Sequence, residues 1–107
     1  MKFKIKKEEL RKIPEVKTDK IIYLNIITGD GKVKFSVFGN EISEQSIETE
    51  ATIERDGFAI IVYNNFKNVV EAFVDGSEIE CEFDGKFFIM NAKNIHIEIM
   101  SYTEIPR

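Results

Sequence analysis

The chain has 107 residues, enough for one domain, and its composition is that of a folded protein: 43% hydrophobic and 32% charged residues, with six glycines and two prolines. No apolar run is long enough to span a membrane, and the amino terminus lacks a signal-peptide pattern, so we expect a cytoplasmic protein that does not bind membranes. The single cysteine, Cys81, excludes an internal disulfide and a cysteine-based zinc site.

The residue types that usually carry catalysis are scarce. His96 is the only histidine, and no glycine-rich loop could cradle a phosphate group. His96 alternates with Ile95 and Ile97, which indicates an ordinary strand residue rather than a catalytic base. Cys81 has strand spacing to its apolar neighbours, which is typical of a small buried hydrophobe. The sequence therefore predicts a protein that is not an enzyme and uses no metal and no cofactor.

The net charge of −4 is the sum over regions of very different charge. Residues 1–40 hold ten Lys and Arg against five Asp and Glu, whereas residues 41–84 hold two against twelve. Residues 85–107 hold three against two. A folded domain can place these regions on different surfaces, so an acidic protein can still present a basic face to a nucleic acid.

The first part of the chain predicts a strand, a helix and a hairpin. Residues 2–6 alternate between lysine and apolar side chains, as in a strand with one buried face. Residues 7–13 have helical spacing and end at Pro14, which cannot continue a helix. Strands over 20–28 and 32–38 are joined by a Gly-Asp-Gly turn.

The remaining elements follow the same rules. Residues 47–53 alternate with acidic side chains up to an Asp-Gly turn, after which 58–63 returns as a strand. An Asn-Asn pair then predicts the start of a helix with apolar side chains at i, i+3, i+4 and i+7: Phe66, Val69, Val70 and Phe73. Strands over 77–83 and 86–92 flank another Asp-Gly turn, and a last strand covers 95–100.

The predicted order is β-α-β-β-β-β-α-β-β-β. Antiparallel hairpins dominate, so the fold class is α+β, with two helices packed on an antiparallel sheet. A strand, a helix and three strands occur at 2–53 and again at 58–100, which indicates a repeated pattern of elements.

Several stretches carry a resemblance to a known family. Residues 1–10, MKFKIKKEEL, are a short strand running into a charged helix, and 21–38 form a hairpin around the Gly-Asp-Gly turn. FKNVVEAF at 66–73 is followed by DGSEIECEF at 75–83, and TEIP at 103–106 is a short extended segment. In this order they resemble one domain of the DNA sliding clamps, the family of the bacterial DNA polymerase III beta subunit.

The resemblance implies one DNA-clamp-like domain over residues 1–107, without catalytic activity. In clamps the outward helix faces line a central hole and meet duplex DNA without sequence preference, while the ring tethers DNA polymerase and other replication or repair proteins. The residues that the two helices would present to the DNA phosphates are Lys7, Arg11, Lys12, Lys67 and Asn68.

The resemblance also bears on assembly. Clamp subunits hold two or three such domains, and six domains close a ring, whereas this sequence predicts one domain. A homo-oligomeric ring would then form through edge strands with unpaired backbone groups, with monomer or dimer as the competing outcome. The expected edge residues are Ile47, Thr49, Ala51 and Ile53 on one side and Ile95, Ile97 and Ile99 on the other.

Two other readings fit parts of the sequence. In a five-stranded oligonucleotide-binding barrel, Tyr23, Lys34, Phe38 and Tyr63 would stack single-stranded bases, but the first strand and helix would be unexplained. A small acidic inhibitor or immunity protein that binds a basic protein would explain the acidic stretch 41–84 alone.

Overall fold

The computed structural model describes residues 1–93 and 95–102. Within them it has nine strands and two short helices, in the predicted order. The elements are β1 (Lys2–Lys6), α1 (Lys7–Leu10), β2 (Tyr23–Gly29), β3 (Lys32–Phe38), β4 (Gln45–Glu50), β5 (Thr52–Arg55), β6 (Phe58–Val62), α2 (Phe66–Glu71), β7 (Glu78–Phe83), β8 (Phe87–Ala92) and β9 (Ile95–Tyr102). The first helix ends at Leu10 rather than residue 13, and the strand expected over 47–53 is divided at Ala51.

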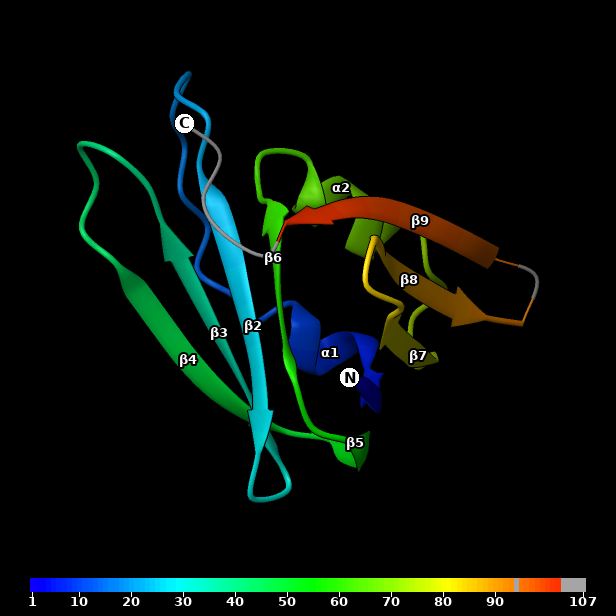
Figure 1. The fold of residues 1–107 in the computed structure, drawn as a ribbon. Coiled ribbons are helices and arrows are strands. Elements are labelled where there is room, and N and C mark those ends of the chain that lie inside the picture. Colours follow the sequence, from blue (N-terminus) through cyan, green and yellow to red (C-terminus); the bar gives the residue numbers. More distant parts are fainter. Residues whose placement is uncertain (94, 103–107) are drawn as a thin grey trace.

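The strands pair antiparallel in the order β4-β3-β2-β6-β9-β8-β7-β1-β5. Figure 1 shows β2, β3 and β4 on one side of the molecule and β7, β8 and β9 on the other. Both ends of the order, β4 and β5, are separated in sequence by Ala51 alone. The chain itself therefore joins the two ends of the sheet.

The pairing is internally symmetric. β1 precedes α1 but pairs with β7, and β6 precedes α2 but pairs with β2, so each half of the chain gives its first strand to the other half. The β1–β7 and β6–β2 pairs have the same register. In the first, Lys2 lies opposite Glu82 and Lys6 opposite Glu78. In the second, Phe58 lies opposite Ile27 and Val62 opposite Tyr23. The repeated pattern of elements in the sequence is thus a repeat in space.

The same symmetry relates β9 to β4 and β5. β9 pairs with β8 along Ile95–Met100 and with β6 at Ser101 and Tyr102. Likewise β4 pairs with β3, and after Ala51 the chain continues as β5 beside β1. We expected the last strand at a sheet edge, but it lies between β6 and β8 in the strand order. Among the described residues, Ile95–Met100 nevertheless has only β8 as a strand neighbour.

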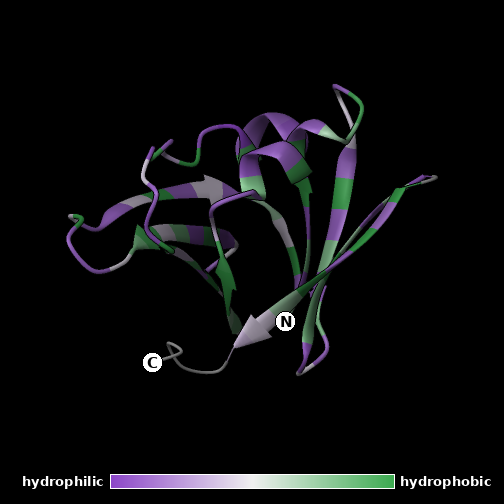
Figure 2. Cartoon of the chain, turned by 90° about the horizontal axis from the view of Figure 1, so that it is seen from above, coloured by the Kyte–Doolittle hydropathy of each residue, from purple (hydrophilic) through white to green (hydrophobic). Residues whose placement is uncertain are grey.

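The core takes alternate side chains from both groups of strands, and Figure 2 shows this alternation of hydrophilic and hydrophobic residues along the strands. Its largest fully buried aromatic side chains are Phe3, Phe35, Phe66, Phe73 and Phe88. Cys81 is buried as predicted, and burial raises the pKa of its thiol. His96 is exposed on β9, where its ring contacts Asn91 and Glu98.

The oligonucleotide-binding barrel is wrong for this chain. It required Tyr63 on the surface, but Tyr63 is 2% exposed. It also left β1 unexplained, whereas β1 lies between β7 and β5 and contributes Phe3 and Ile5 to the core.

Charged side chains cover the outer face of the β1–β7 pair. Lys2, Lys4 and Lys6 of β1 lie opposite a glutamate of β7 in each case: Glu82, Glu80 and Glu78. Lys2 Nζ lies 3.6 Å from Glu80 and 3.6 Å from Glu54 on β5. The pKa of Lys2 is raised, chiefly by Glu80. Much of the acidic stretch is therefore balanced by lysines of the basic amino terminus.

This cross-strand pattern can be tested by charge reversal. Lys4→Glu places two carboxylates opposite each other, so we expect the free energy of unfolding to fall by about 1 kcal/mol in urea titrations. Adding Glu80→Lys should restore most of the loss, because opposite charges again face each other. Equal destabilisation by the single and the double variant would contradict the pairing.

Candidate nucleic-acid interface on the two helices

Each helix begins where a strand of one half meets the other half. The Lys7 N–H, directly after β1, donates to the Ser77 carbonyl (3.0 Å), and the Tyr63 N–H, directly after β6, donates to the Ile22 carbonyl (2.9 Å). Ser77 and Ile22 immediately precede β7 and β2. These equivalent bonds fix both helices to the paired strands, and Figure 2 shows the helices next to each other.

Lys7 and Tyr63 occupy equivalent positions and both point inward. The Lys7 Nζ donates to the Phe73 carbonyl after α2 (2.5 Å), and the Tyr63 hydroxyl donates to the Pro14 carbonyl after α1 (2.6 Å). Each side chain is only 2% exposed. Burial raises the pKa of Tyr63. The side chain from each half thus satisfies a carbonyl at the far end of the other half's helix.

The expected outward position of Lys7 is therefore wrong. α1 has a single turn and starts without a loop after β1, so its first residue lies at the strand junction rather than on the outer helix face. Burial of the ammonium group is tolerated because Asp75 (2.9 Å) and the Phe73 carbonyl accept hydrogen bonds from it. Lys7 cannot meet a DNA phosphate without leaving the core.

Arg11 is exposed, but its guanidinium is hydrogen-bonded to two carboxylates. Its Nε lies 2.9 Å from Glu71 Oε1 and its Nη2 lies 3.0 Å from Glu71 Oε2, a two-pronged bond that ties the residue directly after α1 to α2. The same Nη2 lies 2.7 Å from Asp75 Oδ1. The Arg11 hydrogen bond lowers the pKa of Glu71, and the Lys7 hydrogen bond is the main cause of the lowered pKa of Asp75. The pKa of Arg11 is raised in turn, chiefly by Glu71.

The other expected DNA-binding residues lie around this ion-pair network. Lys12 is 62% exposed, with its Nζ 2.9 Å from Glu9 on the same face. Lys67 is partly buried, which lowers its pKa, and it donates to the Arg11 carbonyl (3.0 Å). Asn68 is exposed on α2.

The helix layer as a whole is electrically balanced. Four cations, Lys7, Arg11, Lys12 and Lys67, share it with four carboxylates, Glu8, Glu9, Glu71 and Asp75. Glu71 and Asp75 each pair with both Lys7 and Arg11, and Glu9 pairs with Lys12. No sequence signal links Arg11 to Glu71, because sixty positions separate them.

Nothing in the described part of the chain forms a metal centre, since no three His, Cys, Asp or Glu side chains converge there. No helix among residues 1–93 and 95–102 is long and apolar enough to cross a membrane.

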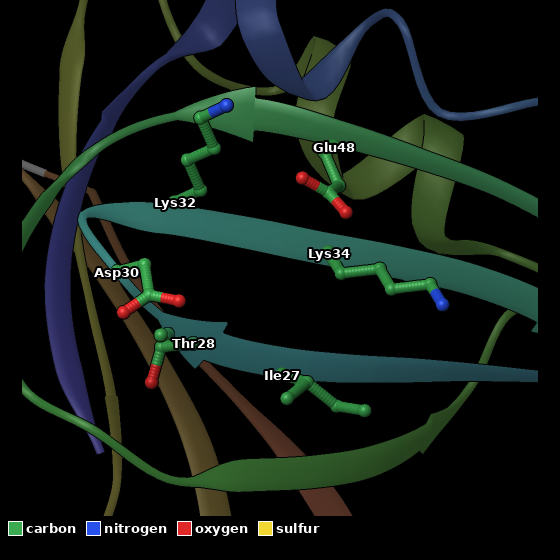
Figure 3. A pocket seen from close by; sticks show the side chains of 7 residues that line it. Ile27, Thr28, Asp30, Lys32, Lys34 and Glu48 are labelled. Carbon is green, nitrogen blue, oxygen red and sulfur yellow. The ribbon is translucent and has the colours of Figure 1, made fainter.

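A shallow hollow of about 380 Å³ lies on the outer side of the β2–β3 hairpin. Figure 3 shows Lys32 and Lys34 from β3 beside Ile27 and Asp30, with the Lys34 side chain extending away from Glu48. The charged groups do not converge on one point, so this hollow lacks the geometry of a catalytic centre.

Comparisons with known proteins bear on the fold. No family model matches the chain, and no curated protein sequence matches it. Among solved structures, the DNA polymerase sliding clamp of Caulobacter crescentus superposes with a TM-score of 0.80 at 18% identity, over 95% of this chain and 30% of that one. The DNA polymerase III subunit beta of Pseudomonas aeruginosa gives 0.80 at 12% identity, over 100% of this chain and 32% of that one.

A third structure is the Helicobacter pylori beta clamp bound to a DNA ligase peptide, with a TM-score of 0.80 at 13% identity, over 100% of this chain and 33% of that one. The chain thus spans about a third of the length of these clamps. It has the sliding-clamp fold, as the sequence resemblance indicated.

Replacing the buried Lys7 tests the site's architecture. Lys7→Met keeps much of the side-chain volume but removes a charged hydrogen bond, so we expect the free energy of unfolding to fall by about 2 kcal/mol. The lowered pKa values of Glu71 and Asp75 stabilise the fold above the ordinary carboxyl range, and this stabilisation is lost as the pH falls through the lowered values.

The variant should therefore lose less stability on acidification than the parent, as measured by urea titrations between pH 7 and pH 3. Lys17→Met, at a side chain that is 88% exposed, is the matched control and should change neither quantity. If both variants behave alike, Lys7 does not hold the two halves together.

Proposed function

We propose that this chain is a non-catalytic clamp-like domain that associates with duplex DNA through its helix layer and tethers replication or repair enzymes. The observation that carries the proposal is the helix layer itself, where Arg11, Lys12, Lys67 and Asn68 lie together on a sliding-clamp fold. Lys7 is not part of the contact surface because it is buried. One domain over residues 1–107 is part of the same proposal.

Charge alone does not select this face. Glu78, Glu80 and Glu82 on β7 lie opposite Lys6, Lys4 and Lys2, and Glu48 and Glu50 on β4 lie opposite Lys34 and Lys32. The strand faces are therefore also balanced in charge, and the choice of the helices rests on the likeness to the clamp fold. Balanced charge permits attraction by counterion release without fixing one position on the duplex.

Charge reversal on the helices tests the DNA contact. The double variant Lys12→Glu with Lys67→Glu should weaken binding to a duplex by at least about tenfold, because two phosphate contacts are replaced by repulsion. Binding of the parent should weaken steeply with salt and should not depend on sequence. Fluorescence anisotropy with two unrelated duplexes at several salt concentrations measures both properties.

The matched control is Lys32→Glu with Lys34→Glu, the same change in charge on β3. This control should bind nearly as the parent does. Equal loss in both double variants would show that only net charge matters, and preference for single strands would contradict contact with duplex DNA.

Partner tethering rests on the clamp likeness. The Helicobacter pylori clamp was solved with a DNA ligase peptide, so that protein holds an enzyme-derived segment on a clamp fold. We extend the role, without assigning a groove, to this chain. A homo-oligomeric ring would bring several copies around the duplex.

The ring would form through two strand segments that have a strand neighbour on one side only. Among the described residues, β4, which carries Ile47 and Thr49, has only β3 as a strand neighbour, and Ile95–Met100, which carries Ile95, Ile97 and Ile99, has only β8. Ala51 and Ile53 follow where the chain passes from β4 into β5. Pairing β4 of one copy with β9 of the next is heterologous, and it closes only if the rotation per copy divides the circle.

Light scattering over a concentration series tests this assembly. We expect the measured mass to rise with concentration toward that of a closed ring, a whole-number multiple of the 12.4 kDa chain. Circular duplex DNA should make the ring form more readily. A monomer at every concentration, with and without DNA, would contradict the ring.

A further inference from the structure

We infer that Glu71 sets the strength of the DNA contact by holding the Arg11 guanidinium, so that this ion pair lowers the affinity of the helix layer for phosphate. This inference rests on the proposed function. It assigns Glu71 a positioning role: the carboxylate acts on DNA affinity only through Arg11.

The geometry gives Glu71 a stronger hold than the other acids have. Both of its oxygens accept from the guanidinium of Arg11, at 2.9 and 3.0 Å. A bidentate pair fixes the plane of the guanidinium, whereas a single contact between exposed chains is easily exchanged with solvent. The link joins the residue that follows α1 to α2, and Lys67 reinforces it by donating to the Arg11 carbonyl at 3.0 Å. Arg11 is therefore anchored at its main chain and at its side chain.

The other acidic residues of the layer have different tasks. Asp75 Oδ1 accepts from Arg11 Nη2 (2.7 Å) and also from the buried Lys7, so its removal would leave a buried ammonium group with one partner fewer. Glu9 accepts from Thr49 (2.5 Å) and pairs with Lys12 within one helical turn. Glu8 accepts from the Gly76 N–H (2.7 Å) and receives no hydrogen bond from the Arg11 side chain. Only Glu71 occupies two donor nitrogens of an exposed cation.

A phosphate that approaches this face must compete with Glu71 for the same nitrogens. Guanidinium binds carboxylate and phosphate with the same two-pronged geometry, so the two acceptors exclude each other. With Glu71 in place, Arg11 adds little to counterion release. Without the charge of Glu71, Arg11 keeps only the bond from its Nη2 to Asp75, so its Nε is free for one further phosphate contact, which steepens the salt dependence of binding.

The test compares two substitutions that change the charge equally. Glu71→Gln weakens the hold on Arg11, and Glu8→Gln removes one negative charge from the same layer without freeing a guanidinium. With a mixed-sequence duplex as the probe, anisotropy at 50 to 200 mM salt should show about five- to tenfold tighter binding for Glu71→Gln, and a salt slope steeper by about one. Glu8→Gln should change affinity less than about twofold with an unchanged slope.

A second variant links the effect to Arg11. Adding Arg11→Gln to Glu71→Gln should return the slope to that of the parent, while thermal unfolding reports that all variants are folded. If Glu71→Gln and Glu8→Gln shift affinity and slope alike, the inference is overturned and the proposed function stands. If neither the parent nor any variant binds the duplex, both are overturned.

Discussion

The exchange of first strands between the two halves is the constraint on which the rest of the structure depends. β1 has only one strand neighbour within its own β-α-β-β-β unit, because it pairs with β7 of the other unit on one side and with β5, at the end of its own unit, on the other. β6 is bound in the same way to β2 of the other unit and to β9 of its own. Each unit alone would leave one edge of its first strand unpaired and apolar side chains exposed, so the backbone and the core are satisfied only when both units are present.

The buried polar contacts follow from this exchange. Each first strand ends at the boundary between the units, so the next side chain, Lys7 or Tyr63, enters the interior beside the other unit's helix end. A buried hydroxyl needs one acceptor, whereas a buried ammonium group needs more. The Lys7 side of the molecule therefore gathers carboxylates, and these same carboxylates engage Arg11. The balanced charge of the helix layer is in this sense a by-product of packing.

Local patterns predict much of the fold. Alternation and Asp-Gly turns locate the strands, and helical spacing locates the buried face of α2, with Phe66 and Val70 inside. These signals act over a few residues, so they are visible in sequence. The break at Ala51 depends on the pairing of β5 with β1, and the burial of Lys7 depends on the carbonyl of Phe73. The bidentate pair of Arg11 and Glu71 joins the end of α1 to α2 across sixty positions, and spacing rules on either helix do not reveal it.

The exchange of strands also orders events during synthesis. β1 leaves the ribosome before β7, and Lys2 has its β7 partner at Glu82, eighty positions later. Contacts of such long sequence separation form slowly, because a large loop must close before they stabilise anything. β1, with Phe3 and Ile5 on one face, must therefore remain unpaired on its β7 side until β7 has been made. The alternating lysines of β1 keep the unpaired strand charged, and charged side chains on an exposed strand edge oppose pairing with other chains.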